Sequence, residues 1–487
     1  MNPSSYANLP ERFFARVQPT PVAAPRLVKL NQALAADLKL DLRGFDASAL
    51  ASLFSGNHLP TGSVPIAMAY AGHQFGHFVP QLGDGRAILL GEMRDQAGVR
   101  RDIQLKGCGR TPYSRGGDGR AALGPVLREY LVSEAMHALA IPSTRSLAAA
   151  TTGESVRRET LLPGAIVTRV AASHVRVGTF EYFAARGDVA GTKILSDYVI
   201  DRHYPQCVRD KSPYLELLRQ VVSRQASLIG RWMNVGFIHG VMNTDNMAVS
   251  GETIDFGPCA FMDAFDPATV FSSIDERGRY SFANQPRVAL WNLARFAETL
   301  LPLIDADTQQ AIGAATEAIG TFEPLFNDGW LAGMRRKLGL STSEQGDRQL
   351  AEDLLQAMHR NQADFTASFR ALCTMACDPQ VDGSVRGPFL DAGGDGEWAQ
   401  RWRARMSREA MSPESRAESM QAVNPAYIPR NHRVEQVIAA AVERGDFAPF
   451  EEFSQVLATP CVARAAFAQY ESPPQPAERV LQTFCGT

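Results

Sequence analysis

Alternating apolar and polar positions in the first third of the chain predict a group of short strands. The segment PQLGDGRAILLGE, residues 80–92, places Gly-Asp-Gly between two apolar runs and predicts a hairpin turn there. Residues 101–107 and 165–170 alternate in the same way and predict two more strands. Residues 1–60 show no such period apart from a helical stretch at 47–54, so we expect mostly irregular structure before the first strand.

Helical periodicity dominates the rest of the chain. One helix is predicted from residue 123, where apolar side chains recur at intervals of three and four residues, and another at 214–235. After residue 170 helices predominate, and beyond residue 304 glycine-rich sequence at 379–396 interrupts them. Strands and helices are therefore segregated along the chain, which indicates an α/β fold of the α+β type.

Two short motifs carry the chemistry that periodicity cannot reveal. Residues 238–247, IHGVMNTDNM, keep the spacing of the His and the metal-binding Asn in the catalytic loop of kinases, and residues 254–257, IDFG, contain the Asp-Phe-Gly of that fold. The catalytic Asp of a kinase would stand at Val241, whose apolar side chain cannot accept a proton. An acid stands instead at Asp245, directly before Asn246. The sequence thus predicts a phosphate and metal site with a displaced proton acceptor.

The residues between Asn246 and Asp255 are expected to bring these two candidate metal ligands together. Residues 247–249 and 253–254 flank a Ser-Gly turn and predict a small hairpin. The two ends of such a hairpin would lie within reach of one cation. His239 is expected to pack and to hydrogen-bond to the backbone rather than to react.

A lysine and an acid complete the predicted nucleotide site. Lys106 ends a predicted strand, and the following helix carries two acids, Glu129 and Glu134, which periodicity cannot separate as its partner. The order of lysine, acid and the two motifs predicts a protein-kinase-like two-lobe fold. The expected division is an N-terminal extension at 1–64, an N-lobe at 65–175, a C-lobe core at 176–310, and a helical C-terminal region with a mobile tail at 311–487.

Two glycine-rich stretches flank Lys106. Residues 83–86, GDGR, precede it, and residues 107–119 follow it just before a helix N-terminus, where backbone N–H groups favour anions. This doubling is unusual for a kinase and indicates that the nucleotide lies differently. Arg169 and Arg176 are further basic candidates, and the sequence leaves open whether they meet phosphates or protein carboxylates.

Composition limits the possible partners. The 487 residues carry a formal net charge of −3 and are 45% hydrophobic, which is typical of a globular protein with no general attraction to nucleic acid or anionic membranes. No apolar run approaches the ~20 residues that span a bilayer, and the N-terminus lacks a signal-peptide core, so a cytoplasmic location is expected. Seven scattered cysteines do not predict a disulfide framework. The pairs His73/His77 and Cys373/Cys377 are more typical of ordinary packing than of metal sites.

Taken together, these residues resemble the selenoprotein O family, kinase-fold proteins long described as pseudokinases. The resemblance covers nearly the whole chain and rests on AGHQFGHFVPQLGDGRA, DIQLKGCGRTPYSRGGDGRA, LREYLVSEAMHAL, GFIHGVMNTDNM, IDFGP and NPAYIPRNHRVEQVI. It implies a protein adenylyltransferase that binds ATP in a flipped orientation and transfers AMP to Ser, Thr or Tyr hydroxyls of proteins. Mg²⁺ would be the metal, with Mn²⁺ left open. A monomer is expected, with neither nucleic acid nor membrane as a partner.

The resemblance also implies a role for each candidate residue. Asn246 and Asp255 would bind the metal, and Asp245 would accept the proton. Lys106 would contact phosphates and pair with Glu129. The nucleotide pocket would be completed by Gly83, Gly85, Arg86, Asp118, Gly119, Arg169 and Arg176. The second glycine loop and the arginines would then hold the γ end of ATP as leaving pyrophosphate.

The near-terminal selenocysteine or cysteine of the family is matched by Cys485. Because Cys259 follows Asp-Phe-Gly closely, a regulatory disulfide between these two cysteines is a further hypothesis.

Two other functions stay open from the sequence. The first is a conventional protein or small-molecule phosphotransferase, and the short gap of nine residues from Asn246 to Asp255 favours the small-molecule type. The second is a non-catalytic nucleotide-binding pseudokinase scaffold, which Val241 favours.

Overall fold

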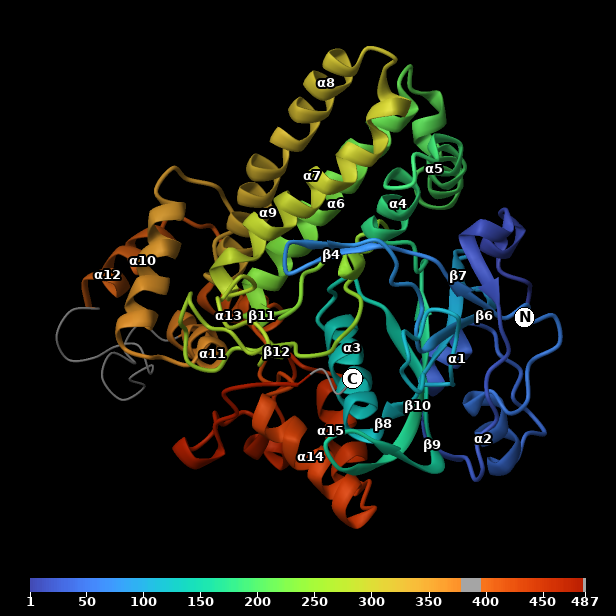
Figure 1. Ribbon diagram of the computed structural model, residues 1–487. Helices are drawn as coiled ribbons and strands as arrows, with labels where there is room; N and C mark the ends of the chain where they lie inside the picture. Colours follow the sequence, from blue (N-terminus) through green and yellow to red (C-terminus); the bar gives the residue numbers. More distant parts are fainter. Residues whose placement is uncertain (378–395, 485–487) are drawn as a thin grey trace.

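The computed structural model describes residues 1–377 and 396–484 and contains a large antiparallel sheet, on the right of Figure 1. The strand order is β1-β3-β6-β7-β10-β9-β2, with β8 paired to β10. Two short pairs, β4 with β5 and β11 with β12, lie outside this sheet. The strands are β1 Phe14–Arg16, β2 Arg26–Leu30, β3 Ile66–Met68, β4 Gly72–Gln74, β5 His77–Val79, β6 Ala87–Arg94, β7 Arg100–Lys106, β8 Ala121–Ala122, β9 Arg145–Arg157, β10 Leu161–Ala171, β11 Phe237–Ile238 and β12 Ala260–Phe261.

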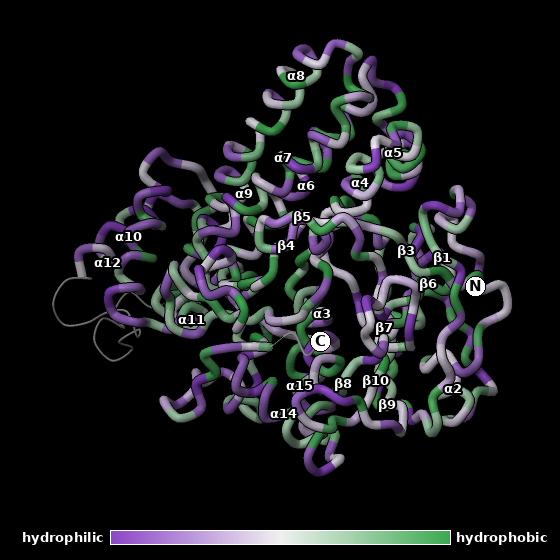
Figure 2. Tube along the Cα trace, in the orientation of Figure 1, coloured by the Kyte–Doolittle hydropathy of each residue, from purple (hydrophilic) through white to green (hydrophobic). Residues whose placement is uncertain are grey.

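Helices make up most of the chain after β10, as the periodicity predicted. Among the longer helices, only α3 in the described residues precedes β10 in the chain. It packs against β9 and β10 and carries Glu129. The helices are α1 Gln32–Asp37, α2 Ala47–Ser55, α3 Leu123–Ala138, α4 Val177–Ala184, α5 Val189–His203, α6 Pro213–Val235, α7 Gln285–Ile304, α8 Thr308–Gly320, α9 Phe322–Lys337, α10 Asp347–Arg360, α11 Phe365–Cys377, α12 Gly396–Met406, α13 Pro413–Gln421, α14 Asn431–Arg444 and α15 Ala448–Leu457. Hydrophilic and hydrophobic colours alternate along α7 and α8 in Figure 2, as expected for helices with one face on a core. The chain therefore has a mixed α and β fold.

The first thirty residues form both edges of the sheet. β1 pairs with β3 at one edge, and β2 pairs with β9 at the other. The prediction of mostly irregular structure before residue 60 was wrong for these strands, although the predicted helix is present as α2. β1 has only three residues and β2 has no fully buried position, so neither produces the alternation by which a strand is recognised in sequence.

The turn predicted at Gly83-Asp84-Gly85 lies elsewhere. The chain reverses at Phe75 and Gly76, between β4 and β5, where both residues have positive φ angles of 51° and 86°. Two successive positive φ angles define the type I′ turn that matches the twist of a hairpin. Glycine adopts this conformation readily, but a bulky residue such as Phe75 rarely does, and therefore this turn could not be predicted from its residue types.

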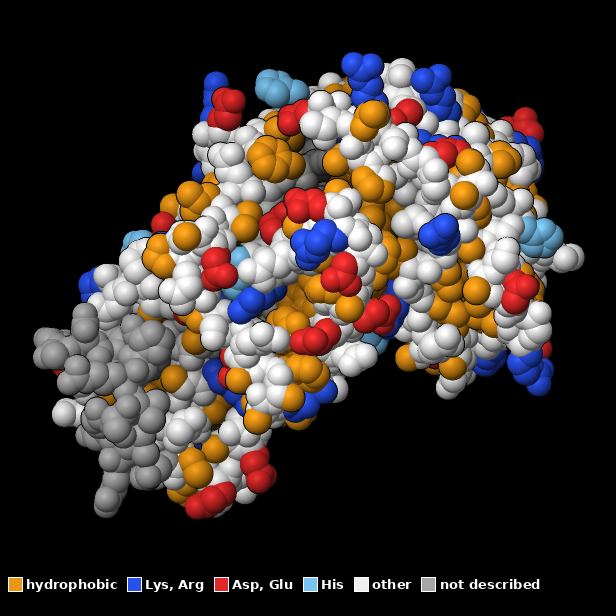
Figure 3. All heavy atoms as spheres, turned by 90° about the horizontal axis from the view of Figure 1, so that it is seen from below, with side chains coloured by type: hydrophobic (Ala, Val, Ile, Leu, Met, Phe, Trp, Pro, Cys, Tyr) orange, Lys and Arg blue, Asp and Glu red, His pale blue; other side chains and the backbone are white. Residues whose placement is uncertain are grey.

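Charges of both signs are interspersed among the described residues on the face shown in Figure 3, without a large basic patch. This distribution agrees with the net charge of −3. In the described part of the chain, no helix combines the length and the apolar character that crossing a membrane requires.

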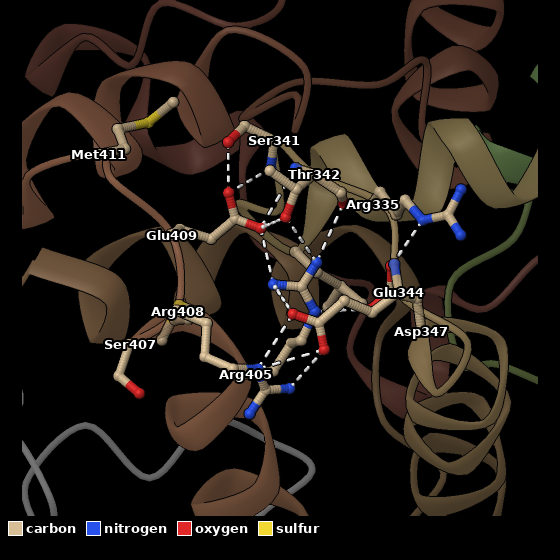
Figure 4. A network of polar contacts seen from close by, with 12 residues as sticks. Arg335, Ser341, Thr342, Glu344, Asp347, Arg405, Ser407, Arg408, Glu409 and Met411 are labelled. Carbon is tan, nitrogen blue, oxygen red and sulfur yellow. Dashed lines mark hydrogen bonds and ion pairs between the residues drawn. The ribbon is translucent and has the colours of Figure 1, made fainter.

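A buried network of ion pairs connects helices α9, α10 and α12 in the C-terminal region (Figure 4). Arg405, with 5% of its side chain exposed, lies 2.7 Å from Asp347 and 2.7 Å from Glu409. Although burial opposes ionisation of Glu409, hydrogen bonds from Ser341, Thr342 and Arg405 lower its pKa to about 2. Arg405 therefore pairs with two enclosed carboxylates, of which Asp347 also has Arg335 at 2.7 Å.

We expect Arg405→Met to lower the free energy of unfolding by about 3–5 kcal/mol, because it leaves a buried carboxylate without its cation. Arg408 is a matched control on the same side of the network. Its side chain is 54% exposed and lies 2.7 Å from Glu344. Arg408→Met should cost less than about 1 kcal/mol. Urea unfolding of both variants measures the difference, and equal losses would contradict the role assigned to Arg405.

Lys337 is the buried lysine of the same region. The residue is 4% exposed, and its ammonium nitrogen lies 4.0 Å from the ring centre of Phe369. Burial lowers the pKa of this lysine to about 7. An unfolded lysine has a pKa of about 10.4, so between these values the unfolded chain binds more protons here than the folded chain. The contribution of this group to stability therefore rises as the pH increases from about 7 to about 10.

Lys337→Met is expected to raise the free energy of unfolding by about 2–4 kcal/mol at pH 6, where charging the buried amine is costly. The gain should shrink to less than about 1 kcal/mol near pH 10, because the folded wild-type amine is then neutral and the pH approaches the pKa of about 10.4 in the unfolded chain. Urea unfolding at the two pH values tests this, with exposed Lys211→Met as the control. A gain that does not change with pH would contradict it.

Candidate active site

A cavity of about 690 Å³ collects nearly all the residues selected from the sequence. Strand β7 contributes Lys106, β10 contributes Arg169, and the loop before α4 contributes Arg176. Asp245 and Asn246 reach it from the short 3₁₀ turn Thr244–Asn246. The wall also includes Gly83, Gly85, Arg86, Asp118, Gly119 and Asp255. Glu129 is the remaining candidate and lies behind Lys106.

Glu129, rather than Glu134, is the partner of Lys106. The lysine nitrogen lies 2.8 Å from Glu129 Oε2, and Arg169 donates to the other oxygen of the same carboxylate. Glu134 instead accepts two hydrogen bonds from Arg145, at 2.7 and 2.8 Å. Although burial alone would raise the pKa of Glu129, Arg169 and Lys106 hold it below its usual range. The acid is therefore ionised and fixes the lysine.

Asp255 is enclosed by three cations. Its Oδ1 lies 3.1 Å from Lys106 Nζ and 2.5 Å from an Arg169 nitrogen, and its Oδ2 lies 3.0 Å from Arg176. Burial would raise the pKa of Asp255, but Arg169, Lys106 and Arg176 together hold it well below its usual range. Its φ angle of 61° is in the left-handed region, which Asp tolerates better than most residues. The question left open by the sequence is thus answered for the free protein, in which both arginines meet a carboxylate.

His239 has the structural role that the sequence predicted. Its Nε2 lies 2.9 Å from the carbonyl oxygen of Ile254, which can only accept, so Nε2 carries the proton. Its Nδ1 accepts from the amide of Val241 at 3.4 Å. Burial lowers the pKa of His239, which keeps the ring neutral. The imidazole therefore ties the catalytic loop to the residue that precedes Asp255.

The small hairpin predicted between Asn246 and Asp255 does not form. The amide of Val249 donates to the carbonyl of Val175 at 3.1 Å, and the amide of Thr253 donates to Pro142 at 2.9 Å. The two arms thus pair with other segments and not with each other. Asn246 and Asp255 nevertheless line the same cavity, because the segment after Asn246 pairs with Val175 and the segment before Asp255 pairs with Pro142.

Asp245 is a buried acid with an unused oxygen. Gln74 is its side-chain contact, at 3.4 Å from Oδ2, while Oδ1 has no hydrogen-bond partner among the described residues. Burial raises its pKa to about 6, an effect that Arg176 opposes. The side chain of Asp245 therefore remains mostly ionised at neutral pH, and this cavity-lining residue has one buried acceptor oxygen that no described group satisfies.

The β4–β5 hairpin brings the sheet side of the molecule to this acid, and the sequence did not predict it. The amide of His73 donates to Thr244 at 2.7 Å, and the amide of Phe75 donates to Asn243 at 3.0 Å. A Cβ atom on Gly72 would lie 2.7 Å from Asp245 Oδ1, so only glycine fits there. Gly72 of the motif AGHQFGHF is the sequence signal that could have indicated this close approach.

The histidines of that hairpin do not form a metal site. His73 Nδ1 lies 2.5 Å from Glu181, whose other oxygen accepts from Thr244 at 2.5 Å. Throughout the described ranges, no group of three or more His, Cys, Asp or Glu residues could hold a metal ion.

The second glycine-rich loop is organised by its own acid. Asp118 lies 2.8 Å from Arg158 and accepts from the amide of Arg120 at 2.9 Å. Gly119, with a φ angle of 69°, passes so close to Gly109 that a Cβ atom would lie 2.1 Å from its carbonyl oxygen. The loop is thus closely folded at the cavity wall, and Arg115, Arg120, Arg157 and Arg158 also line the cavity.

Comparison with known proteins identifies the group to which this chain belongs. Residues 2–458 match the family described as protein adenylyltransferase SelO. The chain belongs to the SelO family. Its relatives named "Protein nucleotidyltransferase YdiU" include one from Rhodopseudomonas palustris strain BisB18, 62% identical over 99% of this chain and 98% of the relative. The protein of that name from Rhizobium rhizogenes strain K84 is 61% identical over 99% of this chain and 96% of its own. The resemblance drawn from the motifs is confirmed.

The SelO-family cysteine hypothesis concerns the C-terminal tail. Cys259 is a buried cysteine, and Cys485 lies outside the described residues. The tail before it contacts the segment after Asp255, because Thr483 donates to the carbonyl of Pro258 at 2.5 Å and pairs with Phe271 at 2.7 Å. A disulfide between Cys259 and Cys485 stays a prediction.

Proposed function

We propose that this protein transfers AMP from ATP to the hydroxyl groups of Ser, Thr or Tyr side chains in substrate proteins and releases pyrophosphate. The observation that carries the proposal is the position of Asp245. It provides an unpaired carboxylate oxygen at a cavity with cationic walls, in a chain that places apolar Val241 where a kinase has its base. Membership of an adenylyltransferase family agrees with this chemistry.

Asn246 and Asp255 are the residues that would hold Mg²⁺. The Asn246 amide nitrogen donates to the carbonyl of Val241 at 2.9 Å, so its oxygen is the atom available to a cation. Mg²⁺ prefers one or two protein oxygens together with substrate phosphates, and this donor set fits that preference. When bound, the ion would neutralise charge on the phosphate oxygens and orient them. Replacing Mg²⁺ by Mn²⁺ in the transfer assay described below tests whether the second ion also supports the reaction.

The protein's own groups supply the remaining steps. Lys106, Arg169 and Arg176 offer positive charge to the triphosphate, and the glycine-rich loops offer backbone N–H groups. The acceptor hydroxyl oxygen forms a bond to the α-phosphorus as the bond between that phosphorus and the bridging oxygen to the β-phosphate breaks. Asp245 accepts the hydroxyl proton. Pyrophosphate leaves toward the arginines of the second glycine-rich loop.

The architecture that we propose for this chemistry is a kinase-like pair of lobes. The sheet and α3, within residues 65–175, would form one wall of the cavity, and residues 176–310 with α6 and α7 would form the other. The extension at 1–64 adds the two edge strands, and residues 311–487 add helices. We also propose a monomer in the cytoplasm, since the seven scattered cysteines of the sequence do not predict the disulfide framework of a secreted protein.

The test uses ATP labelled on the α-phosphate in one sample and on the γ-phosphate in another, with Mg²⁺ and casein as an acceptor. We expect protein-bound label from the α position alone, and intact-mass analysis should find the larger increment of AMP. Label from the γ position alone would establish a phosphotransferase. No label on either the enzyme or casein, together with measurable ATP binding, would favour a scaffold.

A further inference from the structure

The C-terminal helices cover the helix that carries Glu129. α14 and α15 pack against α3 in the lower part of Figure 1. Leu127, Tyr130 and Leu131 of α3 share one apolar cluster with Val434 and Phe450. A Cβ atom on Gly124 would lie 2.9 Å from a methyl group of Ile438, so the two helices approach closely. The C-terminal region therefore completes the packing of α3, a helix of the nucleotide site.

Arg128 connects three parts of the molecule through one buried guanidinium. It precedes Glu129 on α3, and 6% of its side chain is exposed. One nitrogen donates to the carbonyl of Cys259 at 3.3 Å and to the side chain of Asn431 at 2.9 Å. The other terminal nitrogen forms an ion pair with Glu435. The helix of Glu129, the segment after Asp255 and α14 thus meet at this side chain.

Arg430 makes a second connection from the same C-terminal segment. Its side chain is 1% exposed and lies 2.6 Å from Asp263, which is eight residues beyond Asp255. It also makes two contacts with Asp364 of the loop before α11, at 2.8 and 3.0 Å, and donates to the carbonyl of Glu471. Consecutive residues, Arg430 and Asn431, therefore hold the segment that follows Asp255 and the helix that carries Glu129.

We infer that the contacts which Arg430, Asn431 and Glu435 make from the C-terminal region position the AMP-transfer site, with Arg128 and Arg430 as positioning residues. The inference rests on the proposed function. Lys106 is held by Glu129 on α3, and Asp255 is continuous with the segment that Arg128 and Arg430 bind. A shift of α3 or of that segment would separate Lys106, Glu129 and Asp255. Misplacement of reacting groups by about 1 Å can cost about 100-fold in rate.

The motif NPAYIPRNHRVEQVI, residues 424–438, gains a physical explanation from this arrangement. Its Tyr427 and Val434 contribute to the apolar cluster on α3, while its Arg430, Asn431 and Glu435 make the polar connections. A helix that only covered the apolar surface of α3 would not need buried charged side chains, because burying a charge is costly unless it is paired.

The test compares Arg128→Met with Arg433→Met in the full-length protein. Arg433 is the matched control, since it lies on α14 and its partners, Gln436 and Gln469, belong to the C-terminal region. We expect Arg128→Met to lower kcat for AMP transfer by about 10–100-fold. ATP affinity should stay within about threefold, and Arg433→Met should keep kcat within about twofold.

Hydrogen exchange gives a readout that does not depend on turnover. Amides of residues 123–138 and 255–263 should exchange at least about tenfold faster in Arg128→Met than in wild type. If this variant does not fold, Glu435→Gln tests the same connection from a residue whose side chain is 44% exposed, with an expected fall in kcat of about 3–10-fold. A folded variant with wild-type kcat and unchanged exchange in both segments would overturn the inference.

The same experiments separate this inference from the proposed function. If the wild-type protein transfers no α-label, the proposed function fails, and the exchange rates alone decide whether the C-terminal segment positions α3. If the wild type transfers α-label and Arg128→Met does so equally well, the proposed function stands and the positioning role is overturned.

Discussion

Asp255→Ala is expected to abolish AMP transfer, with kcat/KM falling by at least about 1,000-fold. The variant loses the carboxylate that would bind Mg²⁺ and that neutralises Lys106, Arg169 and Arg176 in the free protein. Calorimetric titration with ATP should then show no difference between Mg²⁺ and chelator. In chelator the affinity of the variant should exceed that of the wild type, because Arg176 loses its carboxylate partner and Lys106 and Arg169 keep only Glu129, so positive charge is left to bind phosphate.

A second variant separates charge from backbone conformation at this position. Asn tolerates the left-handed conformation of residue 255 as Asp does, whereas Ala does not. Asp255→Asn should therefore keep the backbone conformation of this residue and still lose the dependence on Mg²⁺. Asp266→Ala, at a partly exposed residue of the same segment, is the control and should stay within about twofold of wild-type activity. Retention of Mg²⁺-dependent ATP affinity in Asp255→Asn would contradict the assigned role.

The site residues that could be identified from sequence spacing are those that lie in one short loop or at the end of one strand. Lys106 ends a strand, and His239 and Asn246 stand in one loop, so their separation along the chain fixes their roles. Glu129 and Glu134 could not be distinguished in this way, because both lie on the inner side of α3. Which acid pairs with Lys106 depends on the packing of α3 against the sheet. Arg169 of β10 binds Glu129, and Arg145 of β9 binds Glu134.

Long-range contacts explain what the sequence did not predict. Gln74 approaches Asp245 only because the β4–β5 hairpin extends from the sheet to the catalytic loop, 171 residues away in sequence. The turn of this hairpin uses Phe75 in a conformation that bulky residues rarely adopt, so turn chemistry pointed instead to Gly83-Asp84-Gly85. β1 and β2 became strands through pairing partners at the sheet edges rather than through their own alternation.

Asp245→Asn is expected to lower kcat by about 100–10,000-fold, the range that a general base contributes, while ATP affinity stays within about threefold. Asn has the same shape as Asp, so it should fit against Gly72 and preserve the packing of the β4–β5 hairpin on the loop. It cannot accept the hydroxyl proton in place of the carboxylate. Asp255 and Asn246 remain, so the predicted metal and phosphate contacts are unchanged.

The measurement pairs single-turnover AMP transfer with ATP titration in Mg²⁺, so that rate and binding are separated for the same sample. Gly72→Ala provides a matched test of geometry, because its methyl group would press on Asp245 Oδ1 and displace the carboxylate without removing it. We expect Gly72→Ala to lower kcat by about 10–100-fold. If Asp245→Asn weakened ATP binding as strongly as it slowed transfer, Asp245 would be a nucleotide ligand instead. If it left kcat unchanged, the proton acceptor would have to be another group at the cavity.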